Sequence, residues 1–173
     1  MPTKQDFLVS ECWILSWNAS AQRASLYSAK AKPKGKHFRQ EVISFITREV
    51  LPAYTTPVPE KTHEANIELI ADTGSQIGSH VLGPAGYKIG VVQKLLNLQL
   101  KYLWCLGCSS EPPHCQIDRV MIGKTSLKGA MNWTQIADIA TYRQVISALK
   151  EAAEPTGLSL ACWELESFDR ADA

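Results

Sequence analysis

The residues most able to do chemistry lie between positions 93 and 119. His114 and Asp118 are four residues apart, so they would face each other if one of the two prolines before His114 opens a helical turn. A carboxylate bonded to one imidazole nitrogen fixes the tautomer of the histidine and raises its basicity. The pair therefore predicts a general base for hydrolysis or phosphodiester cleavage. The alternative is that His114 caps a backbone carbonyl and that Asp118 caps a turn or pairs with Arg119.

A helix just before this pair would add further polar groups. Gln93, Asn97 and Lys101 follow each other at intervals of four residues, which places them on one edge of an otherwise apolar helix. If this edge meets the histidine-bearing turn in an open cavity, the catalytic residues are His114, Asp118, Lys101 and Asn97. The alternative is that these polar side chains only bond loop carbonyls and the ends of neighbouring helices.

A zinc site is a second possibility in the same region. Cys105, Cys108, His114 and Cys115 are suitable zinc ligands within eleven residues. Their spacing is poor, because His114 and Cys115 are adjacent and Cys105 falls inside the expected helix. We expect no metal, but the sequence leaves open whether these four side chains bind zinc.

A phosphate-binding loop is suggested by residues 123–125, which read Gly-Lys-Thr like the end of a Walker A motif. That motif needs a glycine five positions earlier, where this chain has Asp118. No glycine-rich cradle precedes the lysine, so we discount this motif and expect no bound cofactor.

A basic stretch could contact phosphates instead. The predicted nucleic-acid-binding residues are Lys30, Lys32, Lys34, Lys36 and Arg39. Phosphate contacts by such residues weaken steeply as salt rises. The alternative is a solvated surface loop, since runs of like charge repel and stay in water.

A surface for a protein partner or a second copy of the chain is the competing functional hypothesis. Trp is enriched in binding hot spots, and this chain has five tryptophans. An acidic stretch over residues 60–72 could add charge to such a surface. On this interpretation the chain is a non-catalytic interaction module, an inhibitor subunit or a homo-oligomer.

The composition indicates one ordinary folded domain spanning residues 1–173. Hydrophobic residues make up 45% and charged residues 20% of the 173, and the formal net charge is +1. This balance excludes a disordered chain or a strongly basic one. An odd number of cysteines, five, with no secretory signal favours reduced thiols in the cytoplasm. No apolar run is long enough for a membrane span, so we expect no membrane partner.

The hydrophobic pattern predicts a mainly α fold, a single compact helical domain with at most one or two short strands. Helices are expected over residues 6–29, 37–51, 62–72 and 89–106, and from a cap at Thr134 or Asp138 to about residue 153. Gly107 is well placed to end the central helix. Three segments stay ambiguous: a strand over 7–17 competes with the first helix, and residues 116–122 and 158–168 could be helix or strand.

The region of the candidate site resembles a sequence pattern of uncharacterised bacterial hypothetical proteins. The resemblance covers Gln93 to Gly107 (QKLLNLQLKYLWCLG) and Pro112 to Arg119 (PPHCQIDR). It implies a bacterial source and no particular activity. Together with the polar residues, it leads to the hypothesis of a bacterial cytosolic protein that binds or acts on nucleic acid or nucleotides, and whether the chain is an enzyme stays open.

Overall fold

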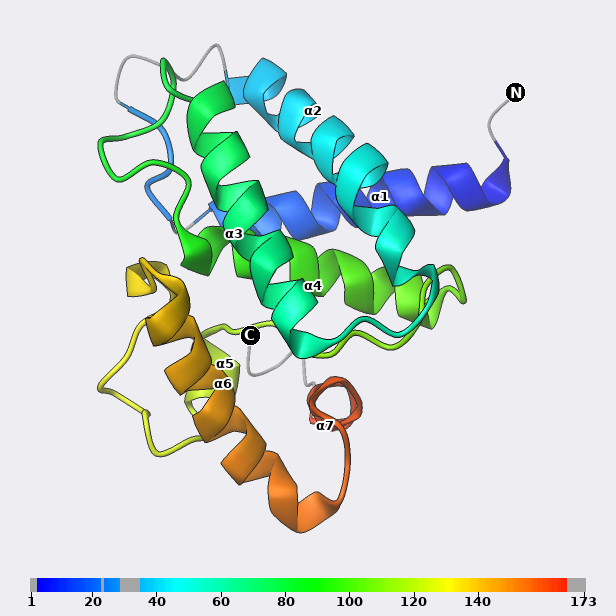
Figure 1. The fold of residues 1–173 in the computed structure, drawn as a ribbon, viewed down its shortest axis with the longest axis vertical. Coiled ribbons are helices and arrows are strands. Elements are labelled where there is room, and N and C mark those ends of the chain that lie inside the picture. The colour runs from blue at the N-terminus through cyan, green and yellow to red at the C-terminus, as the bar shows by residue number, and fades with distance from the viewer. Residues whose placement is uncertain (1–2, 23, 29–34, 168–173) are drawn as a thin grey trace.

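The structure, a computed structural model, describes residues 3–22, 24–28 and 35–167. Within these residues it is mainly helical and contains no strand, only an isolated bridge between Tyr27 and Leu82. This confirms the predicted fold class. The α-helices, shown in Figure 1, are α1 (Lys4–Ala21), α2 (Gly35–Phe45), α3 (Glu60–Ile77), α4 (Ile89–Cys105), α5 (Arg119–Ile122), α6 (Ile139–Ala153) and α7 (Leu160–Glu166).

Helix α1 resolves the first ambiguity in favour of helix rather than strand. A capping box starts it: the Thr3 hydroxyl accepts from the Asp6 amide, and the Asp6 carboxylate accepts from the Thr3 amide at 2.7 Å. The helix ends at Ala21, earlier than the predicted residue 29. The chain turns soon afterwards, and Ser25 lies in the left-handed region with φ 46°.

Helices α2 and α3 differ from the predicted boundaries. After α2 the chain continues as a π-helical turn η2 (Ile46–Val50) and a 3-10 helix η3 (Leu51–Thr55), so the α-helix itself ends at Phe45, before the predicted residue 51. Helix α3 runs from Glu60 to Ile77 and is therefore longer at both ends than the predicted range 62–72. It also runs through Gly74, where a Cβ atom would clash with the ring of Tyr87.

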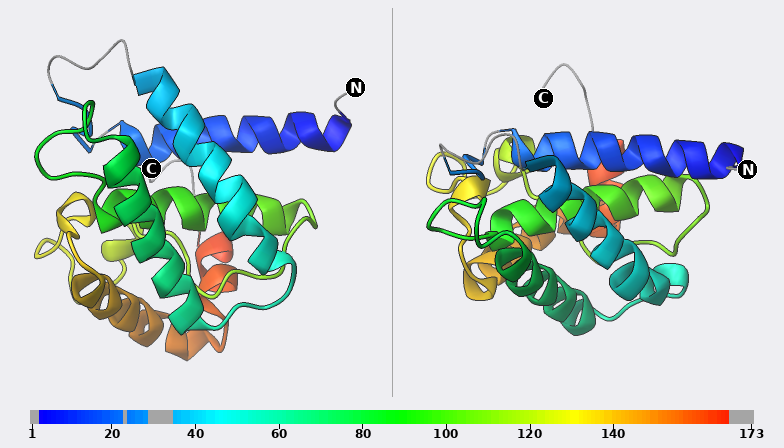
Figure 2. Two further views of the ribbon diagram at one scale, coloured as in Figure 1. Left: turned by 45° about the horizontal axis from the view of Figure 1, so that its top comes forward. Right: turned by 90° about the horizontal axis from the view of Figure 1, so that it is seen from above.

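Helix α4 lies at the centre of the fold, as its sequence predicts. All but four of its 17 residues are buried, and Gly107 follows it with φ +69°. Figure 1 and the right-hand view of Figure 2 show α1 alongside α4, while α2 and α3 lie on one side of this pair and run obliquely to it. One buried apolar cluster connects the chain from Trp13 on α1 to Trp163 on α7.

The C-terminal elements settle the remaining alternatives. Asp118 caps the short helix α5, and Asp138, not Thr134, caps α6 by accepting from the Thr141 amide at 2.7 Å. Residues 158–168 contain the helix α7, which Ser159 caps. A 3-10 turn η4 (Trp133–Gln135) precedes α6. Among the described residues, no helix is both long and apolar enough to cross a membrane.

Candidate functional site

The polar edge of α4 forms as predicted, but it braces the following segment of the chain. The Gln93 amide donates to the Ile117 carbonyl at 2.8 Å, and its oxygen accepts from the Ile117 amide at 2.9 Å. The Asn97 amide donates to the Cys115 carbonyl at 3.0 Å. These bonds satisfy the backbone of a buried segment that has no regular secondary structure. The alternative in which the polar edge supports a loop therefore describes these two residues.

Lys101 belongs to a separate interaction at the other end of this edge. Its Nζ lies 2.7 Å from Oε1 of Glu164 on α7, and both side chains are buried. Gln116 also donates to this carboxylate at 3.4 Å. A lysine in this position neutralises a buried acid and holds α7 against α4.

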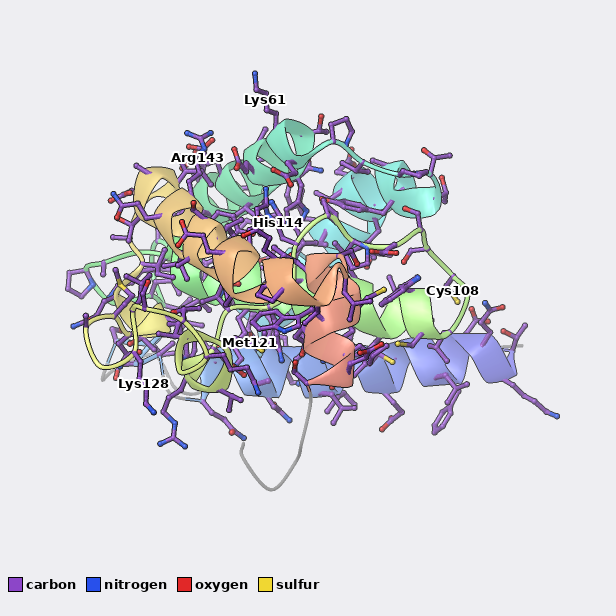
Figure 3. The ribbon with its side chains drawn as sticks, turned by 90° about the horizontal axis from the view of Figure 1, so that it is seen from below. Lys61, Cys108, His114, Met121, Lys128 and Arg143 are labelled. Carbon is purple, nitrogen blue, oxygen red and sulfur yellow. The ribbon has the colours of Figure 1, made fainter. Side chains whose placement is uncertain are left out.

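His114 lies in the interior, between α3, α4 and α6 (Figure 3). Its Nδ1 is 2.9 Å from the hydroxyl of Tyr142, and its ring meets that of His63 edge-on, with 5.1 Å between centroids. Nε2 is 3.7 Å from the Glu60 carboxylate. Burial lowers the pKa of His114, an effect that Glu60 only partly opposes, and burial lowers the pKa of His63 to about 3. Both imidazoles are therefore neutral at pH 7.

The expected pairing of His114 with Asp118 is not what the structure contains. Asp118 accepts from the Met121 amide at 3.0 Å as the cap of α5, and its other oxygen is 3.8 Å from Nζ of Lys94. The reason is that residues 115–118 are not helical, and Asp118 itself is extended. The i, i+4 relationship that would join the two side chains needs a helix.

The four predicted catalytic residues therefore do not meet in one open cavity. His114, Asn97 and Lys101 are 0%, 1% and 7% exposed and bonded to other protein groups, whereas Asp118 lines a surface hollow. The structure also gives no support to a zinc site at Cys105, Cys108, His114 and Cys115. Among the described residues, no three His, Cys, Asp or Glu side chains gather so that they could hold a metal ion. Cys115 is buried next to His114, and Cys105 is exposed at the end of α4.

The basic stretch is only partly described. Lys30, Lys32 and Lys34 lie outside the described residues, so their phosphate-binding role stays a prediction. Lys36 and Arg39 lie on the first turns of α2 and line a groove between α2 and α1. Arg39 lies over the ring of Trp17, with 6.0 Å from the guanidinium carbon to the ring centroid.

The tryptophans do not form the exposed surface that the interaction hypothesis expected. Four of the five are buried, and Trp104 is partly buried. Exposed apolar side chains occur instead on α1. The hydrophobic pattern predicted this segment as a helix but did not indicate that part of its apolar surface faces the solvent.

A cavity that sequence reasoning missed opens between α5 and the loop before α6. Its volume is about 610 Å³, within the usual range of about 300–1,000 Å³ for small-molecule sites. Arg119 and Lys128 are the charged residues that line it, and Lys128 lies at the edge of the molecule in Figure 3. The remaining lining is mixed: Asn132, Thr134 and Gln135 are polar, whereas Ile122, Met131 and Trp133 are apolar.

Close backbone packing positions this cavity. Gly90, in the first turn of α4, donates to the Ile136 carbonyl at 2.9 Å, and a Cβ atom there would clash with the carbonyl oxygen of Trp133. Nζ of Lys94 lies 4.6 Å from the Trp133 ring centroid, which is a cation–π geometry. A smaller hollow of about 230 Å³ shares Arg119 and Trp133 with the cavity. The sequence signals near this cavity are Gly123 and Gly129, which are typical of turns and carry no information about a cavity.

The discounted Walker A motif stays discounted. The Thr125 hydroxyl donates to the Ile122 carbonyl at 2.8 Å, so it serves a local turn.

Comparison of the chain with known proteins found no matching family model, no similar curated protein and no similar solved structure. The function therefore has to be argued from the geometry of the site alone.

Proposed function

We propose that the chain binds the phosphate groups of a nucleotide or nucleic acid in the cavity lined by Arg119 and Lys128. The proposal keeps the ligand class that the sequence suggested and moves its site. It concerns binding rather than catalysis, because His114, Lys101 and Asn97 are buried and committed to protein partners. The five free thiols suit a reducing compartment such as the cytosol.

The observation that supports the proposal is the charge of the lining. Both charged side chains of the lining are cationic, and the rest of the lining is a mixture of neutral polar and apolar groups. A guanidinium presents several donors that match phosphate oxygens, and a lysine adds a point charge. With two cations in a cavity of about 610 Å³, a mononucleotide fits this site better than a long strand, which needs a track of phosphate contacts.

Isothermal titration of the full chain with ATP, GTP, inorganic phosphate and a single-stranded oligonucleotide tests the proposal. We expect a nucleotide to bind, with affinity that falls as salt rises. Arg119→Gln and Lys128→Gln should each weaken binding about tenfold to a hundredfold, since a charge-assisted bond contributes about 1.5–3 kcal/mol. Lys124→Gln is the matched control, because Lys124 is an exposed lysine of the same loop outside the cavity lining.

The outcome of the control decides the interpretation. If all three variants weaken binding equally, the effect comes from net charge and the cavity is not the site. If no phosphate-bearing probe binds the wild type, the proposal is wrong.

A further inference from the structure

Helix α1 carries large apolar side chains on its solvent-exposed side as well as on its buried side. Trp13 and Trp17 point into the core, whereas Phe7, Leu8, Ile14 and Leu15 are between 38% and 62% exposed. These four are the majority of the large apolar side chains exposed among the described residues. Large apolar side chains that are exposed close together on a protein surface commonly mark an interaction site. The outer face of α1 is therefore suited to a partner.

A groove lies beside this face. It has a volume of about 440 Å³ between α1 and α2, and its apolar lining consists of Trp13 and Ile14 from α1 and Ile43 from α2. The charged residues of the lining are Lys36 and Arg39, so the charge along the α2 side is positive. Phe7 and Ile14 are seven residues apart, which places Phe7 on the same face two turns away.

We propose that the groove between α1 and α2 binds an acidic amphipathic α-helix of a protein partner. The apolar stripe of that helix covers Ile14, Ile43 and, two turns along α1, Phe7, and it leaves the part of α1 that carries Glu11 uncovered. Its carboxylates lie along the α2 side, where they meet Lys36 and Arg39. This is the recognition mode in which an amphipathic helix lays its apolar residues into a groove, and the charge of the rim selects for acidic partners.

Charge also argues against two other occupants. A second copy packed on the outer face of α1 by a two-fold axis between Phe7 and Leu15 would bring Glu11 against its own copy. Helices that lie on anionic membranes carry Lys and Arg on their polar face, whereas α1 has Lys4 against Asp6 and Glu11.

The test uses the full chain and three labelled helical peptides of about 20 residues in fluorescence anisotropy. The first has leucines along one face and glutamates on its edges, the second replaces every glutamate by lysine, and the third replaces the leucines by serine. We expect the acidic peptide to bind at least tenfold more tightly than either of the others, and to weaken as salt rises.

Variants assign the binding to the groove. Ile14→Ser should weaken the acidic peptide about tenfold, and Lys36→Glu should reverse the preference toward the lysine peptide. Leu69→Ser and Arg48→Glu are matched controls, because Leu69 on α3 is an exposed apolar residue and Arg48 on η2 an exposed cationic residue, and both lie outside the groove. Circular dichroism checks that each variant folds.

Several results would overturn the proposal. Equal affinity for the acidic and lysine peptides would remove the charge argument, and an unchanged preference in Lys36→Glu would place the binding elsewhere. Self-association that Ile14→Ser abolishes, without peptide binding, would assign the face to a second copy. Tighter binding to vesicles containing phosphatidylserine than to any peptide would assign it to a membrane surface. The nucleotide cavity uses other residues, so its test succeeds or fails independently.

Discussion

The ion pair between Lys101 and Glu164 allows a quantitative test of whether the polar edge of α4 is structural. Nζ lies 2.7 Å from Oε1, and the two side chains are only 9% and 2% exposed. Removing one partner leaves a buried charge without compensation, which costs about 3–5 kcal/mol. We therefore expect Lys101→Met or Glu164→Gln to remove a large part of the stability of the domain, which is about 5–15 kcal/mol for proteins in general.

The double variant makes this prediction specific. Replacing a buried ion pair by apolar side chains of similar volume is often neutral or stabilising. Lys101→Met combined with Glu164→Met should therefore be far more stable than either single variant, and within about 1–2 kcal/mol of the wild type because Gln116 also loses a bond to the carboxylate.

Urea unfolding followed by circular dichroism at pH 7 measures the effect. With an m-value of about 2 kcal/mol per molar urea, each single variant shifts the midpoint down by roughly 1.5–2.5 M. Lys150→Met is the control, because its pair with Glu60 is about half exposed and should contribute less than about 1 kcal/mol. Single variants that cost less than about 1 kcal/mol, or costs that simply add in the double variant, would show that the pair is not buried in solution. Lys101 would then again be a candidate catalytic residue, as the sequence predicted.

Two further predictions concern the buried histidines and the packing of the cavity loop. Stability should be full above pH 6.5 and fall below it, because the unfolded chain binds protons that His63 and His114, with lowered pKa values, do not bind. Each histidine contributes up to about 1.4 kcal/mol per pH unit. Urea midpoints from pH 7.5 to 4.5 measure this, and an equally steep profile in a His63→Gln/His114→Gln variant would contradict it. Gly90→Ala should cost about 1–3 kcal/mol and weaken nucleotide binding, because the new Cβ displaces the Trp133 backbone; unchanged stability and titration curves would refute this.

The parts of the fold that the sequence predicts best are those with a local physical cause. Gly107 ends α4 because it adopts a left-handed conformation, and Asp138 starts α6 because its carboxylate accepts an amide of the first turn. Helix α3 was predicted less well for a non-local reason. The helix contains Gly74 where the ring of Tyr87, thirteen residues further along the chain, occupies the space that a side chain would fill. A propensity for Gly to interrupt helices says nothing about such a neighbour.

The candidate site has the same division between local and non-local information. The spacing of Gln93, Asn97 and Lys101 fixes a shared helix face, and the structure has that face. Spacing does not indicate whether this face is exposed to water or packs against another segment of the chain. Here Gln93 and Asn97 bind the buried backbone carbonyls of Ile117 and Cys115. The partner of His114 is Tyr142, 28 residues away, so no window around the histidine contains it. The cavity depends in turn on a loop without periodicity that packs on α4 only because Gly90 lacks a side chain. A glycine in a buried helix is thus evidence of a close neighbour, and the identity of that neighbour comes only from the three-dimensional structure.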